Sequence, residues 1–537
     1  MRNSIYSVTV EEALTSVRGT GFYQRLVAAI CTAGWVVQGF AISSFLLSLY
    51  RPQLDCDSSD CCETDYQVST QGAAKDWDLV CDTEGVLKNL NVLFLVSLGV
   101  GGLLCLFVSH YKGRKGLSFI GALVAGIGMM ISAGSPSVEI FGASLVFTAV
   151  ALAGATLGTY LLMIESLTHY NRALFSCVIF AGWNAGAVLS SISFGLVEWR
   201  EVLVLGGLLE WLWIPVVLLK VFEPPRSLAV FRGKYSEARS IINLIARINQ
   251  TGPFTEMLEG EKVIGYQEPV AQVDEEKSQS TQSTRKYSFI AISNGIVSVT
   301  EAELKNLRRL NILHLFSLSS VRKRTLLLLV VFTTLEFSDS IFGQYPIISE
   351  KKYLNELVLL VFEVVGYSIS TLLLQSSGRV LGLIMNLSMA GAASMLAVAF
   401  DSSECATDAT CRIQVSVFTT LLILGRIGVR SGKLVSLLLG TEMLPTSIRS
   451  LGLGLIWAAG KTLAIGGVFY LRKEAVILSG GFLMTSAFLA CGLPETLGSP
   501  MEDFADEEQE EMKNPVDVSH VEMPSASPKF EKLNEEE

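Results

Sequence analysis

Twelve apolar stretches, six on each side of a polar interval of about 100 residues, limit what this chain can fold into. Most of them approach the roughly 20 residues that a helix needs to cross a bilayer. Because the hydrocarbon core offers no water to the backbone, such segments fold as helices. The sequence therefore predicts an all-α membrane protein with twelve transmembrane helices in two six-helix bundles, the layout of a secondary transporter with a site between its halves.

The predicted transmembrane segments follow the apolar stretches, and charges interrupt the seventh, tenth and eleventh of them. In chain order they are Leu26–Leu49, Leu87–Ser109, Leu117–Ala133, Val138–Met163, Ala173–Val197, Val202–Phe222, Thr325–Phe342, Leu354–Leu374, Val380–Phe400, Val415–Gly440, Gly452–Leu471 and Ala475–Leu493.

The short loops on one predicted side are basic, whereas the first loop on the other side is acidic. The basic residues are Lys112, Arg114, Lys115, Arg172, Arg379 and Arg449. Positive loops stay in the cytoplasm, so we expect both termini and the middle loop there. The chain then divides into a cytoplasmic N-terminus (1–25), an N-terminal six-helix bundle (26–222, with an external cysteine-rich loop 50–86), a cytoplasmic middle loop (223–324), a C-terminal six-helix bundle (325–496) and an acidic disordered tail (497–537).

The composition agrees with a protein that lies mostly in lipid. Half of the residues are hydrophobic, only 17% are charged, and the mean hydropathy is +0.46. The net charge of −10 comes largely from the first loop and the tail, and no basic run is long enough to bind nucleic acid. We therefore expect a monomer in the lipid bilayer with a small organic ion as its substrate. We expect the plasma membrane, with an intracellular vesicle membrane as the alternative.

Six of the ten cysteines fall in loops that we assign to the outside, where disulfides persist. The disulfide candidates are Cys56, Cys61, Cys62, Cys81, Cys405 and Cys411. A local pair of Cys405 with Cys411 is plausible, while the other four allow three pairings. The rival interpretation, a zinc cluster, finds no histidine in those loops, so we expect no metal site.

Four local motifs stand in order at the ends of predicted helices. They read Lys75-Asp-Trp-Asp-Leu-Val-Cys81-Asp82, Glu223-Pro-Pro-Arg226, Thr441-Glu-Met-Leu-Pro445-Thr-Ser-Ile-Arg449-Ser-Leu-Gly452 and Leu493-Pro-Glu-Thr496. These motifs resemble those of organic cation and anion transporters, solute carrier family 22 of the major facilitator superfamily, over roughly Phe22 to Thr496. The stretch that begins at Glu11 is also similar to synaptic-vesicle transporter-like proteins. The resemblance implies the major facilitator fold.

The chain departs from that superfamily in two loops where an acid is expected. His110 stands at the aspartate position of the second–third loop, and Gln375 replaces an acid in the eighth–ninth loop. In the family those acids lock one bundle against the other in one access state. Their absence leaves two interpretations open: a transporter with a looser balance, or a receptor or scaffold of the same fold that does not transport.

Acids and bases remain at the predicted cytoplasmic helix ends. We expect the acids to pair with the arginines and close an inner gate, or alternatively each group to lie singly in the headgroup region. The gating and motif candidates are Gly113, Arg114, Lys115, Glu165, Arg172, Glu223, Arg226, Gly378, Arg379, Glu442, Arg449 and Glu495.

The most specific chemical signal lies in the tenth and eleventh segments. Arg426, Arg430 and Lys433 are spaced four and three apart, which places them on one helical face, and Lys461 lies midway along the eleventh segment. Charges at that depth are costly, so they face a partner or a watery space. By the resemblance, Lys461 aligns with a position that is an aspartate in cation transporters and an arginine in anion transporters. A cation there favours anionic substrates.

Internal pairing competes with this interpretation. Glu336, Asp339 and Glu363 lie in the seventh and eighth segments and could neutralise three of the four cations, or Glu336 and Asp339 could bind the amine of a cationic or zwitterionic substrate. Aromatic side chains could line an amphiphile site or serve only in packing. The substrate-binding candidates are Lys461, Arg430, Lys433, Gln38, Trp183, Phe194, Asp339, Phe342, Tyr367 and Trp457.

The sequence contains no nucleotide-binding loop and no catalytic triad, so we expect neither an enzyme nor a cofactor. The predicted function is facilitated transport or exchange of small organic anions by alternating access. The alternatives are transport of organic cations or zwitterions such as carnitine-like compounds, and a non-transporting receptor or scaffold.

Overall fold

The structure is a computed structural model, which describes residues 7–50, 72–79, 84–258, 316, 319–343, 352–400, 409–469 and 473–501. Long helices dominate it. The N-terminal half holds α2 (Phe22–Ser48), α4 (Glu84–Ala133), α5 (Val138–Ile164), α6 (Arg172–Leu196) and α7 (Trp199–Lys220). The C-terminal half holds α12 (Ser319–Phe342), α13 (Lys352–Ser376), α14 (Arg379–Ala399), α15 (Ala409–Met443), α16 (Arg449–Phe469) and α17 (Lys473–Ala490).

All twelve predicted segments fall on these helices, and the prediction of an all-α, two-bundle fold is confirmed. Ten segments are long and apolar enough to cross a membrane. The other two are α15, which charges interrupt, and α17, whose apolar part Glu474–Ala490 is shorter.

The second and third segments share the label α4, but they are two helices that meet at Gly113, where the backbone is not helical and φ is 81°. One predicted boundary differs from the observed one. The seventh helix begins at Ser319 instead of Thr325, because its basic first turn (Arg322 to Arg324) is helical despite its low hydropathy.

Glycines let the helices of the N-terminal half approach closely. A Cβ atom on Gly39 would lie 2.3 Å from the carbonyl oxygen of Trp183, and one on Gly186 would lie 1.9 Å from that of Val36. Small residues of this kind allow helix backbones to pack together where lipid provides no hydrophobic drive. The contact of α2 with α6 fixes the position of Asn184, which belongs to the candidate site.

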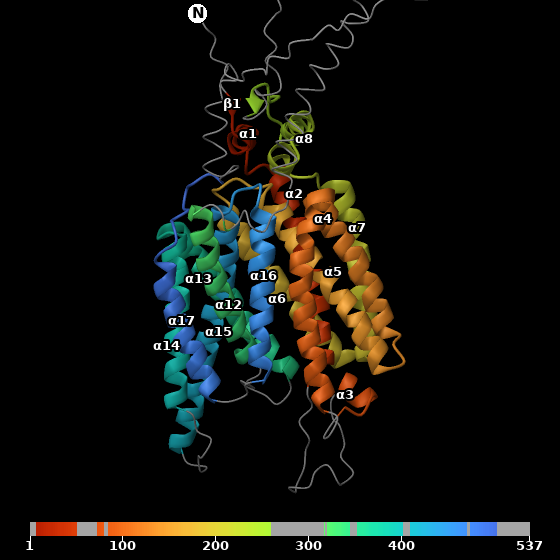
Figure 1. Ribbon diagram of the computed structural model, residues 1–537, viewed down its shortest axis with the longest axis vertical. Helices are drawn as coiled ribbons and strands as arrows, with labels where there is room; N and C mark the ends of the chain where they lie inside the picture. Colours follow the sequence, from red (N-terminus) through yellow and green to blue (C-terminus); the bar gives the residue numbers. More distant parts are fainter. Residues whose placement is uncertain are drawn as a thin grey trace, which may run out of the picture.

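The two halves meet where α4 packs on α16 and α6 packs on α13 (Figure 1). At the first contact, a Cβ atom on Gly102 would lie 2.7 Å from Trp457 Cδ1, and one on Gly99 would lie 3.3 Å from the Ala458 oxygen. The halves therefore touch along helices that also carry candidate binding residues.

Short elements cover one end of the bundle, where Figure 1 shows α1 and α8. They are β1 (Ser7–Val8), α1 (Val10–Ser16), the π-helix η2 (Ser227–Phe231), α8 (Tyr235–Ile248) and β2 (Met257–Leu258). Strands β1 and β2 pair in parallel, with Ser7 opposite Met257. We call this the arginine end, because Arg114, Arg172, Arg379 and Arg449 lie there.

The opposite end carries α3 (Ala73–Asp76), which belongs to the external motif of the sequence. Asp76 Oδ2 accepts hydrogen bonds from Arg200 Nε at 2.9 Å and from Trp199 Nε1 at 3.1 Å. The Arg200 guanidinium also lies over the rings of Trp199 (4.7 Å) and Trp77 (5.3 Å). These contacts, which we call the α3 clamp, hold the end of the first loop against α7.

Candidate functional site

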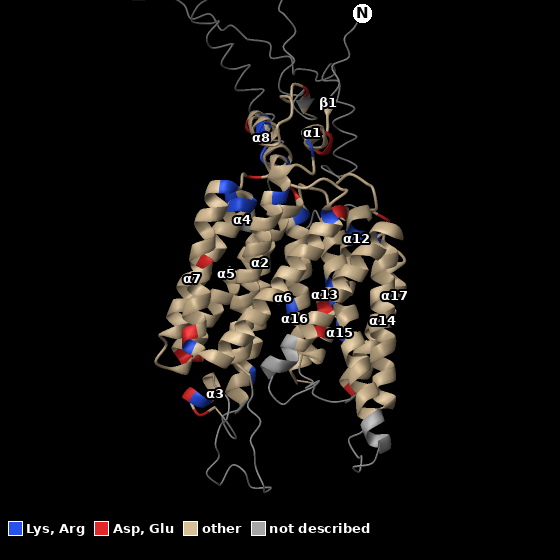
Figure 2. Cartoon of the chain, turned by 180° about the vertical axis from the view of Figure 1, so that it is seen from behind, with Lys and Arg blue, Asp and Glu red and all other residues tan. Residues whose placement is uncertain are grey.

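Besides those at the α3 end, charged residues gather in two places, at the arginine end and midway along α13, α15 and α16 (Figure 2). The second group, the central network, unites residues from four helices of the C-terminal half. Its members are Glu336, Asp339, Glu363, Arg426, Arg430, Lys433 and Lys461. The helical spacing of the α15 cations turns them toward α12 and α13, as one helical face requires.

One side of the central network is built on Glu336. Its Oε2 atom accepts a hydrogen bond from Lys461 Nζ at 2.7 Å, and its Oε1 atom lies 2.9 Å from Lys433 Nζ. Lys433 Nζ also donates to Asp339 Oδ2 at 2.7 Å. Lys433 is thus shared by two carboxylates of α12. It can reach both because Glu336 and Asp339 are about one helical turn apart and lie on the same face of that helix.

The other side is built on Glu363. Its Oε1 atom accepts from Arg426 Nε at 2.8 Å and lies 3.7 Å from Arg430 Nε, which forms a closer ion pair with Asp339 Oδ1 at 2.7 Å. Asn184 of α6 donates to Glu363 Oε2 at 2.7 Å. Since α6 belongs to the N-terminal half, this hydrogen bond links the network to the other bundle.

Among the described residues of the central network, four cations face three carboxylates. Burial is also uneven: the side chains of Arg430, Lys461 and Asp339 are 22%, 16% and 15% exposed, whereas those of Arg426 and Glu363 are 3% and 4% exposed. Buried ion pairs contribute little to stability after desolvation. Stability alone therefore does not account for these charges, and the partly exposed residues Arg430, Lys461 and Asp339 are the ones that a ligand can reach.

Three aromatic candidates lie beside this network. Lys461 Nζ lies 4.7 Å from the ring centre of Trp457, whose own indole nitrogen is buried without a hydrogen-bond partner among the described residues. Tyr367 accepts a hydrogen bond from Asn184 at 3.2 Å. Phe342 is buried against Gly425 of α15, where a Cβ atom would lie 2.8 Å from the ring.

The other three candidates contact the N-terminal half instead. Gln38 is fully buried and donates to Thr159 at 3.3 Å, while its amide oxygen has no partner among the described residues. Trp183 packs edge-on against Trp35, with ring centres 5.6 Å apart. Phe194 is partly buried in the apolar core of that half. The sequence could not separate these residues from the central network, because helix positions alone do not give the direction of a side chain.

At the arginine end, an acid that follows α7 caps the interruption of α4. Glu223 accepts hydrogen bonds from the backbone amides of Arg114 at 2.7 Å and Lys115 at 3.0 Å. A Cβ atom at Gly113 would lie 2.3 Å from Glu223 Oε1, so the motif glycine is required both for its positive φ and for this approach. The carboxylate here does the work of an N-cap.

The C-terminal half repeats this arrangement. Glu495 accepts from the backbone amides of Arg379 at 2.8 Å and Val380 at 3.1 Å, at the start of α14. Gly378 precedes them with φ of 106°, and a Cβ atom there would lie 2.5 Å from Glu495 Oε2. The exposed side chain of Gln375 takes no part in this cap.

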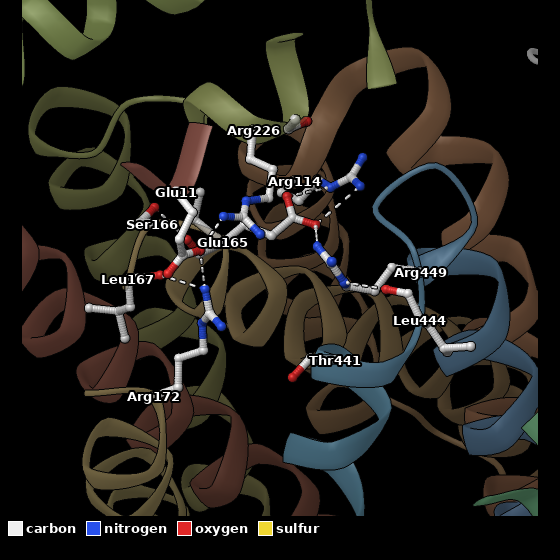
Figure 3. Close-up of polar contacts among 12 residues, drawn as sticks. Glu11, Arg114, Glu165, Ser166, Leu167, Arg172, Arg226, Thr441, Leu444 and Arg449 are labelled. Carbon is white, nitrogen blue, oxygen red and sulfur yellow. Dashed lines mark hydrogen bonds and ion pairs between the residues drawn. The ribbon is translucent and has the colours of Figure 1, made fainter. Parts of the chain in front are cut away.

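One ion-pair chain crosses between the halves at this end (Figure 3). Glu165, after α5, receives Arg114 Nε at 3.1 Å and Arg449 Nη1 from the C-terminal half at 3.3 Å. All three side chains are fully buried. In the C-terminal half, Arg379 Nε lies 3.6 Å from Glu442 Oε2, so the expected pairing of acids with arginines occurs here.

Arg172 and Arg226 find a partner that the sequence did not indicate. Both donate through Nη2 to Glu11 Oε2, with a distance of 2.5 Å for Arg172, and the His169 amide donates to Glu11 Oε1 at 2.8 Å. Burial raises the pKa of the Glu11 carboxyl, but Arg226, Arg172 and the His169 amide outweigh it and lower the pKa from 4.5 to about 2. The available signal was the pattern Thr-x-x-Glu from Thr9, which predicts a helix start and places Glu11 in its first turn.

Some predicted residues lie outside the described part of the chain. They are Cys56, Cys61, Cys62, Cys81 and Cys405, together with the side chains of Cys411 and His110. Within the described residues, no group of three or more His, Cys, Asp or Glu side chains is arranged to hold a metal.

Comparisons with known proteins agree with the motifs. No protein-family model matches the chain. It is 23% identical to mouse solute carrier family 22 member 21 over 84% of this chain and 74% of that protein. It is 26% identical to the organic cation/carnitine transporter 4 of Arabidopsis thaliana, but over 43% of this chain and 46% of that protein, which is less than half of either.

Among solved structures, the proton:xylose symporter XylE from E. coli matches with a TM-score of 0.63 at 14% identity, covering 90% of this chain and 98% of that one. These relatives and structural neighbours are transporters and not enzymes, which supports a secondary transporter here as well. The chain is thus a multi-pass membrane protein with the major facilitator fold, related by sequence to the solute carrier family 22 transporters.

Proposed function

We propose that this protein carries small organic anions across the membrane by alternating access, and that the central network binds them. The observation that carries the proposal is the partly exposed ammonium group of Lys461 beside Trp457, in a network where the described residues supply four cations and three carboxylates. An anionic group placed there would gain charge-assisted hydrogen bonds in a poorly hydrated site. It would also balance the charge of the seven described groups of the network.

Lys461 is the cation best placed to meet a ligand. Among the described residues Glu336 is its one hydrogen-bond partner, and the ammonium nitrogen lies over the Trp457 ring. A substrate carboxylate can compete with Glu336 for the ammonium group, while Lys433 continues to neutralise Glu336. The aromatic face beside it suits a flat organic body.

The contacts between the halves support a rocking cycle around this site. Asn184 joins the N-terminal half to Glu363 in the centre, and Arg449 joins the C-terminal half to Glu165 at the arginine end. The latter pair closes that end, which we assign to the cytoplasm from the basic loops. Opening toward the cytoplasm then requires the Arg449–Glu165 pair to break.

The test is uptake of a mixed panel of organic anions, cations and zwitterions into proteoliposomes. Wild type is expected to take up anions. Lys461→Asp is expected to reduce that uptake at least about tenfold, because the substitution places a second carboxylate beside Glu336. Lys461→Arg is expected to retain the uptake. Lys220→Asp, at an exposed position near the end of α7, is the matched control and leaves uptake unchanged. Absence of flux for every compound from folded, inserted wild-type protein would favour a receptor or scaffold.

A zwitterionic substrate is the second candidate, because Asp339 is exposed beside Arg430 and could receive an ammonium group. The Arabidopsis relative is named an organic cation/carnitine transporter. If a zwitterion is the substrate, Asp339→Asn abolishes its uptake as fully as Lys461→Asp does, whereas anion uptake tolerates Asp339→Asn.

A further inference from the structure

The two halves carry the same acid and base at the arginine end, but use them differently. Each half has a glutamate after its fourth helix and an arginine seven positions later, Glu165 with Arg172 and Glu442 with Arg449. Arg449 crosses to Glu165 of the other half at 3.3 Å. The symmetry of two such repeats would have Arg172 cross to Glu442 in the same way.

That second crossing is not formed. Arg172 uses only Nη2, which donates to Glu11 at 2.5 Å and to the Leu167 carbonyl oxygen at 3.3 Å. Its Nε and Nη1 atoms are buried without a hydrogen-bond partner among the described residues. Glu442 is close enough to interact electrostatically with Arg172, but its Oε2 atom accepts from Thr496 at 2.5 Å.

Glu11 comes from α1, which lies outside the membrane helices and has its own supports. Thr9 and Glu12 cap the helix reciprocally, with distances of 2.9 and 3.2 Å. Behind it, Asn249 after α8 donates to the Val17 carbonyl oxygen at 2.9 Å. The carboxylate of Glu11 therefore reaches Arg172 from α1 and not from a membrane-spanning helix (Figure 3).

We propose that Glu11 is a positioning residue of the transport cycle, which acts by holding Arg172 away from Glu442. When α1 is docked, one ion pair closes the arginine end across the two halves. When Glu11 is withdrawn, Arg172 turns its unpartnered nitrogens to Glu442, a second crossing pair forms, and the closed state becomes more stable. A docked N-terminal segment thus makes the arginine end easier to open. The idea rests on the alternating access proposed above.

The competition follows from charge and reach. Glu11 pairs with both Arg172 and Arg226, so its loss removes the carboxylate that the buried guanidinium of Arg172 contacts, and that guanidinium then needs another acid. Glu442 is the acid of the other half that interacts with Arg172. Its link to Arg379 is loose, at 3.6 Å, so Glu442 can accept a new donor.

The experiment measures the separation of the halves without any substrate, so that failure to transport and failure of this idea are distinguishable. Bio-orthogonal spin labels at the exposed positions Lys220 and Ser376 report the distance across the arginine end by double electron–electron resonance in nanodiscs. Glu11→Gln is expected to raise the ratio of closed to open populations about fivefold or more. Adding Glu442→Gln to Glu11→Gln is expected to return the ratio to the wild-type value.

Two further variants keep the test decisive. Glu12→Gln preserves the cap of α1 and does not touch the arginines, so it leaves the populations unchanged. Glu11→Asp keeps the charge but has a shorter side chain, so it is expected to shift the populations toward the closed state by less than Glu11→Gln does. Glu11→Asp replaces Glu11→Gln in the test if the latter does not fold. A shift toward the open state, no shift, or a shift that Glu442→Gln does not reverse would overturn the proposal.

Discussion

Glu11 shows how one side chain can tie a flanking segment to a membrane bundle. It is buried, it faces two fully buried guanidiniums, and it belongs to a helix of only seven residues. A helix this short is not stable on its own. Its position therefore depends on the ion pairs, on the β1–β2 pairing and on Asn249.

The lowered pKa of Glu11 gives the docking of α1 a defined response to acid. A carboxyl with a pKa of about 2 when docked and 4.5 when free stabilises docking fully above pH 4.5 and loses that contribution as the pH falls toward 2. A fluorophore encoded at the exposed Ser16 should report release of α1 in this range, and Glu11→Gln should abolish the transition. A transition centred well above pH 4.5 would mean that a group other than Glu11 controls the docking.

Among the elements, α3 gives the external motif a physical role. Asp76 receives both Arg200 and Trp199, and the three residues pack with Trp77. Asp76→Ala is expected to cost about 1 kcal/mol of local stability, because the pair is partly exposed. Hydrogen exchange of residues 72–79 should become faster.

A double-mutant cycle checks this assignment. If the α3 clamp acts as a unit, Arg200→Ala added to Asp76→Ala costs less than the sum of the two single changes. Additive effects would mean that the two residues act separately.

The helices themselves were readable from the sequence, but their partners were not. Hydropathy predicted the segments, and the spacing of Arg430 and Lys433 predicted a common face. Lys433 contacts both Glu336 and Asp339 because of the way α12 packs on α15, and no local sequence pattern encodes that packing. The same holds for Glu11, whose partners lie more than 150 residues away in the chain.

Across the whole molecule, the sequence predicted two repeats, and the caps of Glu223 and Glu495 repeat each other closely. The departure from symmetry was not predictable, because it arises where α1 supplies an extra acid, Glu11, to Arg172. His110 and Gln375 marked missing loop acids. In the described structure, the crossing between halves is nevertheless made by Glu165.

The net charge of the central network, one cation in excess among the described residues, also couples the molecule to the electric field of its membrane. One elementary charge moved across 100 mV is worth about 2.3 kcal/mol. An empty site with one excess cation should therefore be drawn toward a negative interior, while a site filled by a monovalent anion is neutral and indifferent to voltage. Voltage steps should then evoke transient currents in empty carriers that saturating monoanion suppresses, and currents of equal size with and without substrate would contradict this charge count.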